Sequence, residues 1–288
     1  MQARASSPHI YVGSPGPPAS VDLLDAAIRE IVSRRRLIRY LVAAATRKAG
    51  TNTLLGHVWW ILDPLLQMPL YVLLVGMILR SGTADYPLFV FAAVLPWKWF
   101  TSSVADATTS VSTRDQLIKQ VPFPKLVLPV AAITSGIPQF AFGLIPLLGL
   151  MLLFYRDRIS VFLLLIPIVA AVQLLLTLAA GILLSAFDVF ARDTGRLAGH
   201  VLRLWFFLSP GLYSTDRIDH VTARYPAVGF LFRLNPFTTL FEAYRDLIYR
   251  ARLPDPAPLA WLLIASACLL AITLILFKRL EPRFAKVL

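Results

Sequence analysis

The chain has 288 residues, of which 57% are hydrophobic and only 15% charged, and its mean hydropathy is +0.69. Soluble domains carry about a quarter charged residues, so this composition excludes an ordinary soluble protein and indicates an integral membrane protein. The formal net charge of +12 does not indicate nucleic-acid binding here, because excess Lys and Arg in a membrane protein first marks cytoplasmic loops and contacts with anionic lipid headgroups.

Residues 1–19 are rich in Pro, Gly and Ser, which predicts a disordered tail, and Ser20 can then cap a helix that begins at Val21. Apolar residues follow at helical spacing, and arginines follow them: Leu23, Leu24, Ala27, Ile28 and Ile31, then Arg34, Arg35, Arg36 and Arg39. This pattern predicts an amphipathic interface helix within residues 20–50, lying on the inner leaflet of the membrane. A solvated helix packed on the protein's own cytoplasmic face is the alternative.

The segment Thr53–Tyr71 is an apolar run that also carries two tryptophans, two prolines, Asp63 and Gln67. Asp63 and Gln67 lie four residues apart, so they share one face of a helix. Polar groups in hydrocarbon are costly and usually face a partner helix or a hydrated path. The segment is therefore predicted to be a spanning helix of a transport protein rather than a simple membrane anchor.

Six apolar runs predict six transmembrane helices in a permease domain of residues 51–288. They are Val58–Leu79, Pro87–Ala105, Val127–Tyr155, Val161–Phe190, Leu197–Tyr213 and Leu259–Phe277. The third and fourth are longer than a bilayer requires and should tilt, and the fifth is short and contains Ser209-Pro210-Gly211. The predicted fold class is an all-α integral membrane protein.

The basic residues predict that both termini are cytoplasmic. With that orientation the cytoplasmic segments hold 17 Lys and Arg residues and the external segments hold nine. An excess of Lys and Arg in cytoplasmic loops is the usual pattern in membrane proteins. The last external loop carries six arginines, which five acidic residues offset.

The loop between the second and third predicted spans contains a short helical stretch at about residues 112–122, which Pro122 and Pro124 end. Its apolar residues can form one patch, which two basic residues flank. The patch is Leu117, Ile118 and Val121, and the flanking residues are Arg114 and Lys119. A small cytoplasmic helix with an exposed apolar tip suits docking into a groove of a soluble partner. An ordinary loop buried against neighbouring helices is the alternative.

A second unusual segment, at about residues 225–250, lies outside by the charge count and holds apolar stretches too short to span a membrane. Asn235-Pro236 is a helix-start signal. Apolar residues at helical spacing follow it, namely Phe237, Leu240, Phe241, Tyr244, Leu247 and Ile248, with Glu242, Arg245 and Asp246 on the opposite face. The pattern predicts two short helices that dip back into the outer leaflet.

The sequence contains no G-x-x-x-x-G-K-[ST] motif, so it is not predicted to bind ATP by a P-loop. Its histidines, His9, His57, His200 and His220, are scattered. No metal site, no catalytic Ser/His/Asp set and no cofactor is therefore predicted in this chain, which we expect not to be an enzyme.

Five motifs occur in order between Leu37 and the C-terminus. They are Leu55-Gly56-x-x-Trp59-x-x-x-x-Pro64-Leu65, Tyr86-Pro87-Leu88-Phe89 with Leu95-Pro96-Trp97-x-x-Phe100, Leu117-Ile118-x-x-Val121-x-Phe123-Pro124, Asp188-Val189-x-x-Arg192-Asp193 and Asn235-Pro236. With them the chain resembles the membrane subunit of polysaccharide-export ABC transporters of the O-antigen and teichoic-acid type. It departs from that family at Ala49-Gly50, where many members carry an Arg-aromatic pair.

The resemblance implies that two such permeases pair with two ATP-binding subunits, which bind ATP and Mg²⁺. It also implies that the helix at 112–122 is a coupling helix and that the short external helices form a lid over the exit. The coupling residues would be Arg114, Leu117, Ile118, Lys119, Val121 and Phe123. The lid residues would be Asn235, Phe237, Phe241 and Tyr244.

Six spans are too few to enclose a wide path, but two copies around a two-fold axis would enclose one. A polysaccharide path favours aromatic walls, because the C–H faces of sugars pack on rings while their hydroxyls stay hydrated. The predicted lining residues are Trp59, Trp60, Asp63, Tyr71, Phe89, Trp97, Lys98, Trp99 and Phe100. Each aromatic residue among them has an alternative place in an interfacial belt or in the core.

Together these observations predict a homodimeric permease that exports a lipid-linked polysaccharide across the plasma (inner) membrane of a bacterium, driven by a separate ATPase. Its partners would be a second copy, the ATP-binding subunit, the glycan and membrane lipids, with no nucleic acid. One alternative is a drug or small-lipid exporter of the same superfamily. Another is a membrane-embedded glycan transferase, which would need convergent acids, whereas Asp63, Asp106 and Asp188 show no Asp-x-x-Asp pairing.

Overall fold

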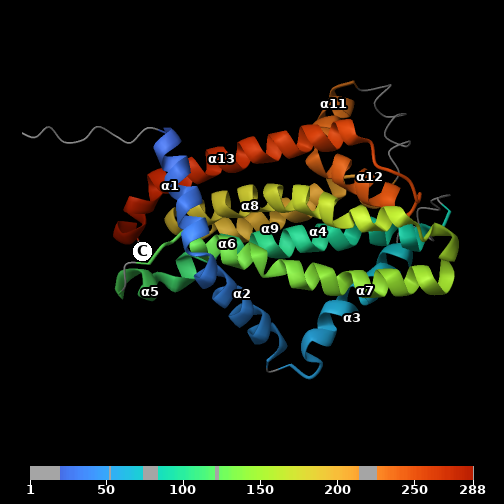
Figure 1. Cartoon of the computed structure of the whole chain (residues 1–288), viewed down its shortest axis with the longest axis horizontal. Coiled ribbons are helices and arrows are strands. Elements are labelled where there is room, and N and C mark those ends of the chain that lie inside the picture. Colours follow the sequence, from blue (N-terminus) through green and yellow to red (C-terminus); the bar gives the residue numbers. More distant parts are fainter. Residues whose placement is uncertain (1–19, 52, 74–83, 121–122, 214–225, 288) are drawn as a thin grey trace, which may run out of the picture.

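The computed structural model describes residues 20–51, 53–73, 84–120, 123–213 and 226–287. Within these ranges every regular element is helical. The long helices run side by side, and α5 lies at the opposite end of them from α12 (Figure 1). The α-helices are α1 (Ser20–Ser33), α2 (Arg35–Gly50), α3 (Trp59–Tyr71), α4 (Tyr86–Thr108), α5 (Asp115–Gln120), α6 (Val127–Thr134), α7 (Gly136–Phe154), α8 (Ile166–Phe190), α9 (Thr194–Leu208), α11 (Pro226–Leu234), α12 (Pro236–Ile248) and α13 (Pro256–Val287).

Four helical segments are long and apolar enough to cross a membrane: Tyr86–Arg114, Val127–Phe154, Val161–Phe190 and Pro256–Phe284. They correspond to the second, third, fourth and sixth predicted spans, so the expectation of an all-helical membrane protein is confirmed. The two other predicted spans coincide with shorter helices, α3 and α9. The predicted first span continues into residues 74–79, which lie outside the described part of the chain, and six spans therefore stay a prediction.

Helix α9 is short because of its last residues. It has 15 residues, which extend over about 22 Å at 1.5 Å per residue, less than the ~30 Å hydrocarbon core of a bilayer. Ser209 follows in an extended conformation, as the residue before a proline usually does. The Ser209-Pro210 pair thus ends this helix before it reaches full spanning length.

Helix α4 is the centre of the fold. In its most apolar window 78% of the residues are buried, against 22–33% in the three other candidate spans. Small residues allow close approach between helices, and a Cβ added at Gly181 of α8 would lie 2.9 Å from the Cβ of Ala107 on α4. Because α7, α8, α9 and α12 all pack on it, most of α4 is core rather than lipid-facing surface.

Residues 20–50 form two helices, α1 and α2, rather than one. Lys278 of α13 forms ion pairs with Glu30 of α1 and with Glu281, and Ala27 and Ile38 are buried in a core cluster shared with α6 and α13. This packing agrees with the alternative interpretation of a helix on the protein's own face. Val21, Ile28 and Val32 of α1 remain exposed, so contact between α1 and lipid stays a prediction.

The turn between α2 and α3 is built around Gly50 and His57. The His57 Nε2 donates a hydrogen bond to the carbonyl of Thr46 over 2.9 Å, and a Cβ at Gly50 would lie 2.3 Å from the His57 ring. Any larger residue at position 50 would displace this ring. The departure from the family pattern at Ala49-Gly50 therefore has a local structural reason.

Candidate functional site

Asp63 of α3 and Lys98 of α4 form an ion pair. The Asp63 Oδ2 lies 3.0 Å from the Lys98 Nζ, and the side chains are 42% and 21% exposed, respectively. Both residues were predicted to line the path, but their pairing was not predicted. The sequence pattern that could have indicated this pair is an acid and a base in two apolar helices that follow each other, since a lone charge in hydrocarbon is costly and usually finds a partner.

The predicted lining residues on α3 remain accessible. Trp59 is 39% exposed, and Trp60 and Tyr71 are half-buried. The Trp60 ring meets His57 edge to face, with ring centres 4.6 Å apart. Helix α3 thus presents aromatic and acidic side chains on an accessible face.

The predicted lining aromatics on α4 are buried. Phe89, Trp97, Trp99 and Phe100 are all at most 7% exposed. The Trp97 and Phe100 rings pack on Phe237 of α12, with centroids 4.6 and 4.7 Å away. In this chain they belong to the core, as their alternative interpretation held, because α4 is surrounded by other helices.

The predicted helix start at Asn235-Pro236 is observed. The Asn235 Oδ1 accepts hydrogen bonds from the backbone N–H of Phe237 and from the indole N–H of Trp205, both over 3.1 Å, and its Nδ2 donates to Ser209 over 2.8 Å. This side chain therefore caps α12 and joins it to α9. The predicted lid residues Phe237, Phe241 and Tyr244 are fully buried, so their rings contact the core rather than an opening.

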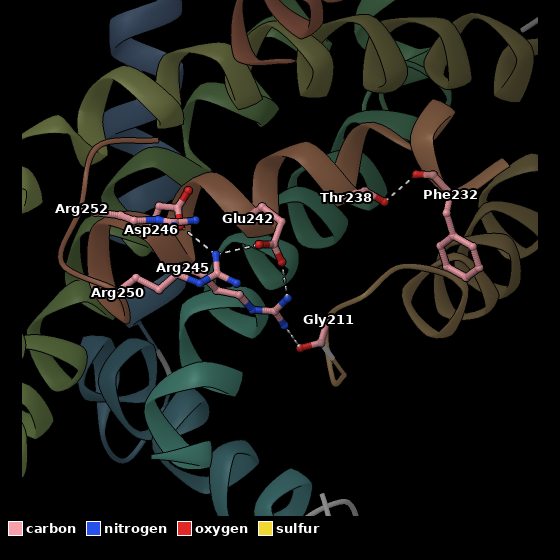
Figure 2. Close-up of polar contacts among 8 residues, drawn as sticks. All are labelled: Gly211, Phe232, Thr238, Glu242, Arg245, Asp246, Arg250 and Arg252. Atoms are coloured by element: carbon pink, nitrogen blue, oxygen red, sulfur yellow. Dashed lines mark hydrogen bonds and ion pairs between the residues drawn. The ribbon is translucent and has the colours of Figure 1, made fainter. Parts of the chain in front are cut away.

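A charge network on α12 was missed by the sequence interpretation, which placed its members on a polar outer face. Arg245 is fully buried; its Nη2 donates to the carbonyl of Gly211 over 2.7 Å, its Nη1 lies 3.3 Å from Glu242, and its guanidinium lies over Phe89 at 3.6 Å from the ring centre. Figure 2 shows the bonds to Gly211 and Glu242. Both faces of α12 are covered, so buried charge on it requires partners.

The same network continues past the end of α12. Arg250 Nη1 lies 2.7 Å from both Glu242 and Asp246, and Arg252 Nε lies 2.8 Å from Asp246 (Figure 2). Acids and arginines that follow each other at spacings of three, four, six and eight residues are the sequence pattern that could have indicated this network. The network ties α12 to the segment that leads into α13.

The predicted coupling segment forms helix α5, but its apolar tip is only partly described. Ile118 is 7% exposed and packs in the core cluster with α6 and α13, and Phe123 packs half-buried against it. The Ile118 side chain is therefore not the exposed docking tip that was expected, because it packs against this chain's own helices. Val121 and the side chain of Leu117 lie outside the described residues. Lys119 is exposed.

Asp188 joins the turn before α5 to the end of α8 and the start of α9. It is 2% exposed; its Oδ2 accepts a hydrogen bond from Ser112 over 2.5 Å, and its Oδ1 accepts one from the backbone N–H of Gly195 over 3.1 Å. The sequence interpretation gave this motif residue no role. Its two bonds connect the segment next to α5 with α9.

Comparison with known proteins decides the family. The model of the ABC-2 type transporter family matches residues 36–249. The chain belongs to this family. The ABC-2 match spans the segment from α2 to the end of α12, so it includes the Asp63–Lys98 pair, α5 and the α12 network.

The comparison with curated relatives gives a more specific result than the match to the ABC-2 family. The chain is 33% identical over 259 residues to an O-antigen export system permease protein, RfbA, of Myxococcus xanthus, which covers 90% of this chain and 98% of that one. It is also 28% and 26% identical to two proteins of the same name from Klebsiella pneumoniae, each over 82% of this chain and 89% of the relative. The family resemblance inferred from the motifs is confirmed.

Proposed function

We propose that this chain is the permease subunit of an ABC transporter that exports a lipid-linked polysaccharide of the O-antigen class. The observation that carries the proposal is the 33% identity to an O-antigen export permease along 98% of that protein. The three relatives, all named O-antigen export permeases, favour this substrate class over a drug or a small lipid. Export would run from the cytoplasm to the outer face of the bacterial inner membrane.

The proposed transporter contains two copies of this permease and two copies of an ATP-binding subunit. The ABC-2 family implies such a partner, and the absence of a P-loop motif from the sequence supports placing ATP and Mg²⁺ in it. Helix α5 would dock on the ATPase through its exposed side, which includes Gln116 and Lys119. The bonds of Asp188 to Ser112 and Gly195 would carry its movement to α9.

In the proposed topology both termini and α5 are cytoplasmic, α3 and α9 belong to the first and fifth spans, and α11 and α12 are external re-entrant helices. The count of Lys and Arg supports this orientation. The opposite positions of α5 and α12 along the bundle (Figure 1) are consistent with it. The exposed apolar residues of α1 would contact the inner leaflet.

The proposed path runs along α3 and the accessible side of α4. Its lining retains Trp59, Trp60, Asp63, Tyr71 and Lys98, which are exposed or half-buried. The ion pair of Asp63 with Lys98 gives this face hydrogen-bonding capacity for hydroxyls without net charge. A second copy would close the path on its open side.

The proposed function is tested by export in intact bacteria that lack this chain but retain glycan synthesis and the ATP-binding subunit. We expect no surface glycan and accumulation of lipid-linked glycan inside, with both reversed when the chain is restored. Immunolabelling of unpermeabilised cells measures surface glycan. Normal surface glycan without the chain would overturn the proposal.

Two tryptophan variants test the path within this experiment. Trp60→Ala should lower surface glycan while leaving the amount of membrane-inserted protein unchanged, because its ring is only half-buried. Trp97→Ala should instead lower the amount of folded protein, because loss of a buried Trp typically costs about 3–5 kcal/mol. If the two variants behave alike, Trp60 does not line the path.

A further inference from the structure

One face of α4 is polar and accessible, although the helix is the centre of the fold. Lys98, Ser102 and Asp106 follow each other at intervals of four residues, which places them along one side of the helix. Lys98 and Ser102 are half-buried, and Asp106 is exposed, as are Thr109 and Thr113 just beyond the helix. The buried core thus leaves a line of polar groups from the α5 end toward the Asp63–Lys98 pair.

A hollow lies at the α5 end of this line, between α2, α4, the turn Ser112–Arg114 and α6. Its volume is about 210 Å³. At ~30 Å³ per molecule of liquid water, this is room for about seven waters, or for one monosaccharide ring. Asp106, Thr113 and Arg114 supply polar lining, and Leu41 and Ala132 supply apolar walls.

The charged groups of the hollow have unused hydrogen-bonding capacity. Among the described residues none forms a hydrogen bond or ion pair with the Asp106 carboxylate. Arg114 makes one long bond, from Nη1 to the carbonyl of Ser110 over 3.4 Å, which leaves four of its five N–H donors. The hollow therefore offers acceptors on one residue and donors on another.

This combination favours a neutral ligand with many hydroxyls. A phosphate would be attracted by Arg114 but repelled by Asp106, and a cation would be attracted by Asp106 but repelled by Arg114. A hydroxyl can interact with both residues, because it donates a hydrogen bond to a carboxylate and accepts one from a guanidinium. The side chains of Leu41 and Ala132 suit the C–H face of a sugar ring. We propose that this hollow binds a sugar unit of the exported polysaccharide at the entrance of the path; the inference rests on the proposed function.

The polar line meets α3 beside Lys98. The space there, between Trp60 and Trp99, has a volume of about 10 Å³, which is room for about one water. A sugar ring does not fit between α3 and α4, so from the hollow it would continue over the accessible side of the Asp63–Lys98 pair. The hollow thus lies at the α5 end of the proposed path.

Photocrosslinking in exporting cells tests the entry site. The photoreactive amino acid p-benzoylphenylalanine replaces Thr113 in the hollow or, as a control, Leu164, which is 76% exposed in the turn before α8. Irradiation should give a glycan-bearing adduct at position 113 and none at 164. With the photoreactive residue at 113, Asp106→Ala should lower the adduct yield at least fivefold, and Asp157→Ala, an exposed carboxylate on another turn, should not.

The outcomes separate this inference from the function on which it rests. If the unmodified chain fails to restore surface glycan, the proposed function fails. If it restores surface glycan but position 113 gives no adduct, or Asp106→Ala leaves the yield unchanged, the entry site is wrong. Cells unable to make the glycan serve as a second control. A lipid adduct at position 113 in these cells, equal in yield to the glycan-bearing adduct in exporting cells, would identify a lipid headgroup as the occupant and overturn the sugar assignment.

Discussion

The network on α12 and the hollow beside α4 both contain arginine and acidic side chains, but they use them differently. On α12 each charge has a partner, and the fully buried Arg245 contacts a carboxylate, a carbonyl and a ring. In the hollow Asp106 has no partner among the described residues, and Arg114 has one long bond. Paired buried charges hold elements in one arrangement, whereas unpaired charges beside a cavity are available to a ligand. Substitutions at four sites, each with a matched variant, test this difference.

The largest effect should come from Arg245→Met on α12. The substitution keeps much of the side-chain volume. It leaves the buried Gly211 carbonyl without its donor, which typically costs about 1–3 kcal/mol, and it removes the desolvated contact with the Phe89 ring, which contributes about 2 kcal/mol. Thermal unfolding of the detergent-purified protein measures it. Arg252→Met is the matched control, because Arg252 is 63% exposed and such pairs contribute about 0–1 kcal/mol. Equal losses in the two variants would mean that burial of Arg245 does not matter for stability.

The next effect concerns Asp188, which connects α8 and α9 with the turn before α5. Asp188→Ala removes acceptors from Ser112 and Gly195, and bonds to a charged group typically contribute about 1.5–3 kcal/mol. We expect this loss in stability and, in a complex with the proposed ATP-binding subunit, slower ATP hydrolysis by that subunit. Ser112→Ala removes one bond only and should cost less than Asp188→Ala. If Ser112→Ala is as impaired as Asp188→Ala, the bond from Gly195 to Asp188 contributes nothing to the effect.

The sequence predicted the helices better than it predicted which of their side chains are buried. Long apolar runs identified four helices, and Asn235-Pro236 identified the start of α12, because composition and capping are local properties. The inward packing of Ile118 was not predictable, since apolar residues at i, i+1 and i+4 look the same whether the patch faces a partner or the chain's own core. Arg245 was placed on an outer face because periodicity does not show that both sides of α12 are covered.

The Asp63–Lys98 pair shows the same limit. The two residues lie 35 positions apart, so no local pattern connects them. The sequence indicated only that each charge in an apolar helix needs a partner or water. Which partner it finds depends on how α3 crosses α4, and this is a property of the packed structure.

A smaller effect on stability is expected for the Asp63–Lys98 pair. It is partly exposed, and a pair of this kind contributes about 1 kcal/mol or less. The Lys98→Ala variant should therefore insert normally but lower surface glycan, because an unpaired Asp63 leaves net negative charge on the proposed path. Exchange of the two residues, Asp63→Lys with Lys98→Asp, should restore part of the export. If the exchange is no better than the single variant, the pairing has no role in transport.

The smallest effect on stability should come from Asp106→Ala in the hollow. No described residue pairs with this carboxylate, so its removal breaks no interaction, and surface substitutions of this kind usually change stability by about 0.5 kcal/mol or less. The midpoint of thermal unfolding should match that of the unchanged protein, while surface glycan falls. Asp106→Asn, which keeps the shape and one acceptor oxygen, should retain more export than Asp106→Ala. A clear loss of stability in Asp106→Ala would show that the carboxylate has a structural partner and would remove the contrast with α12.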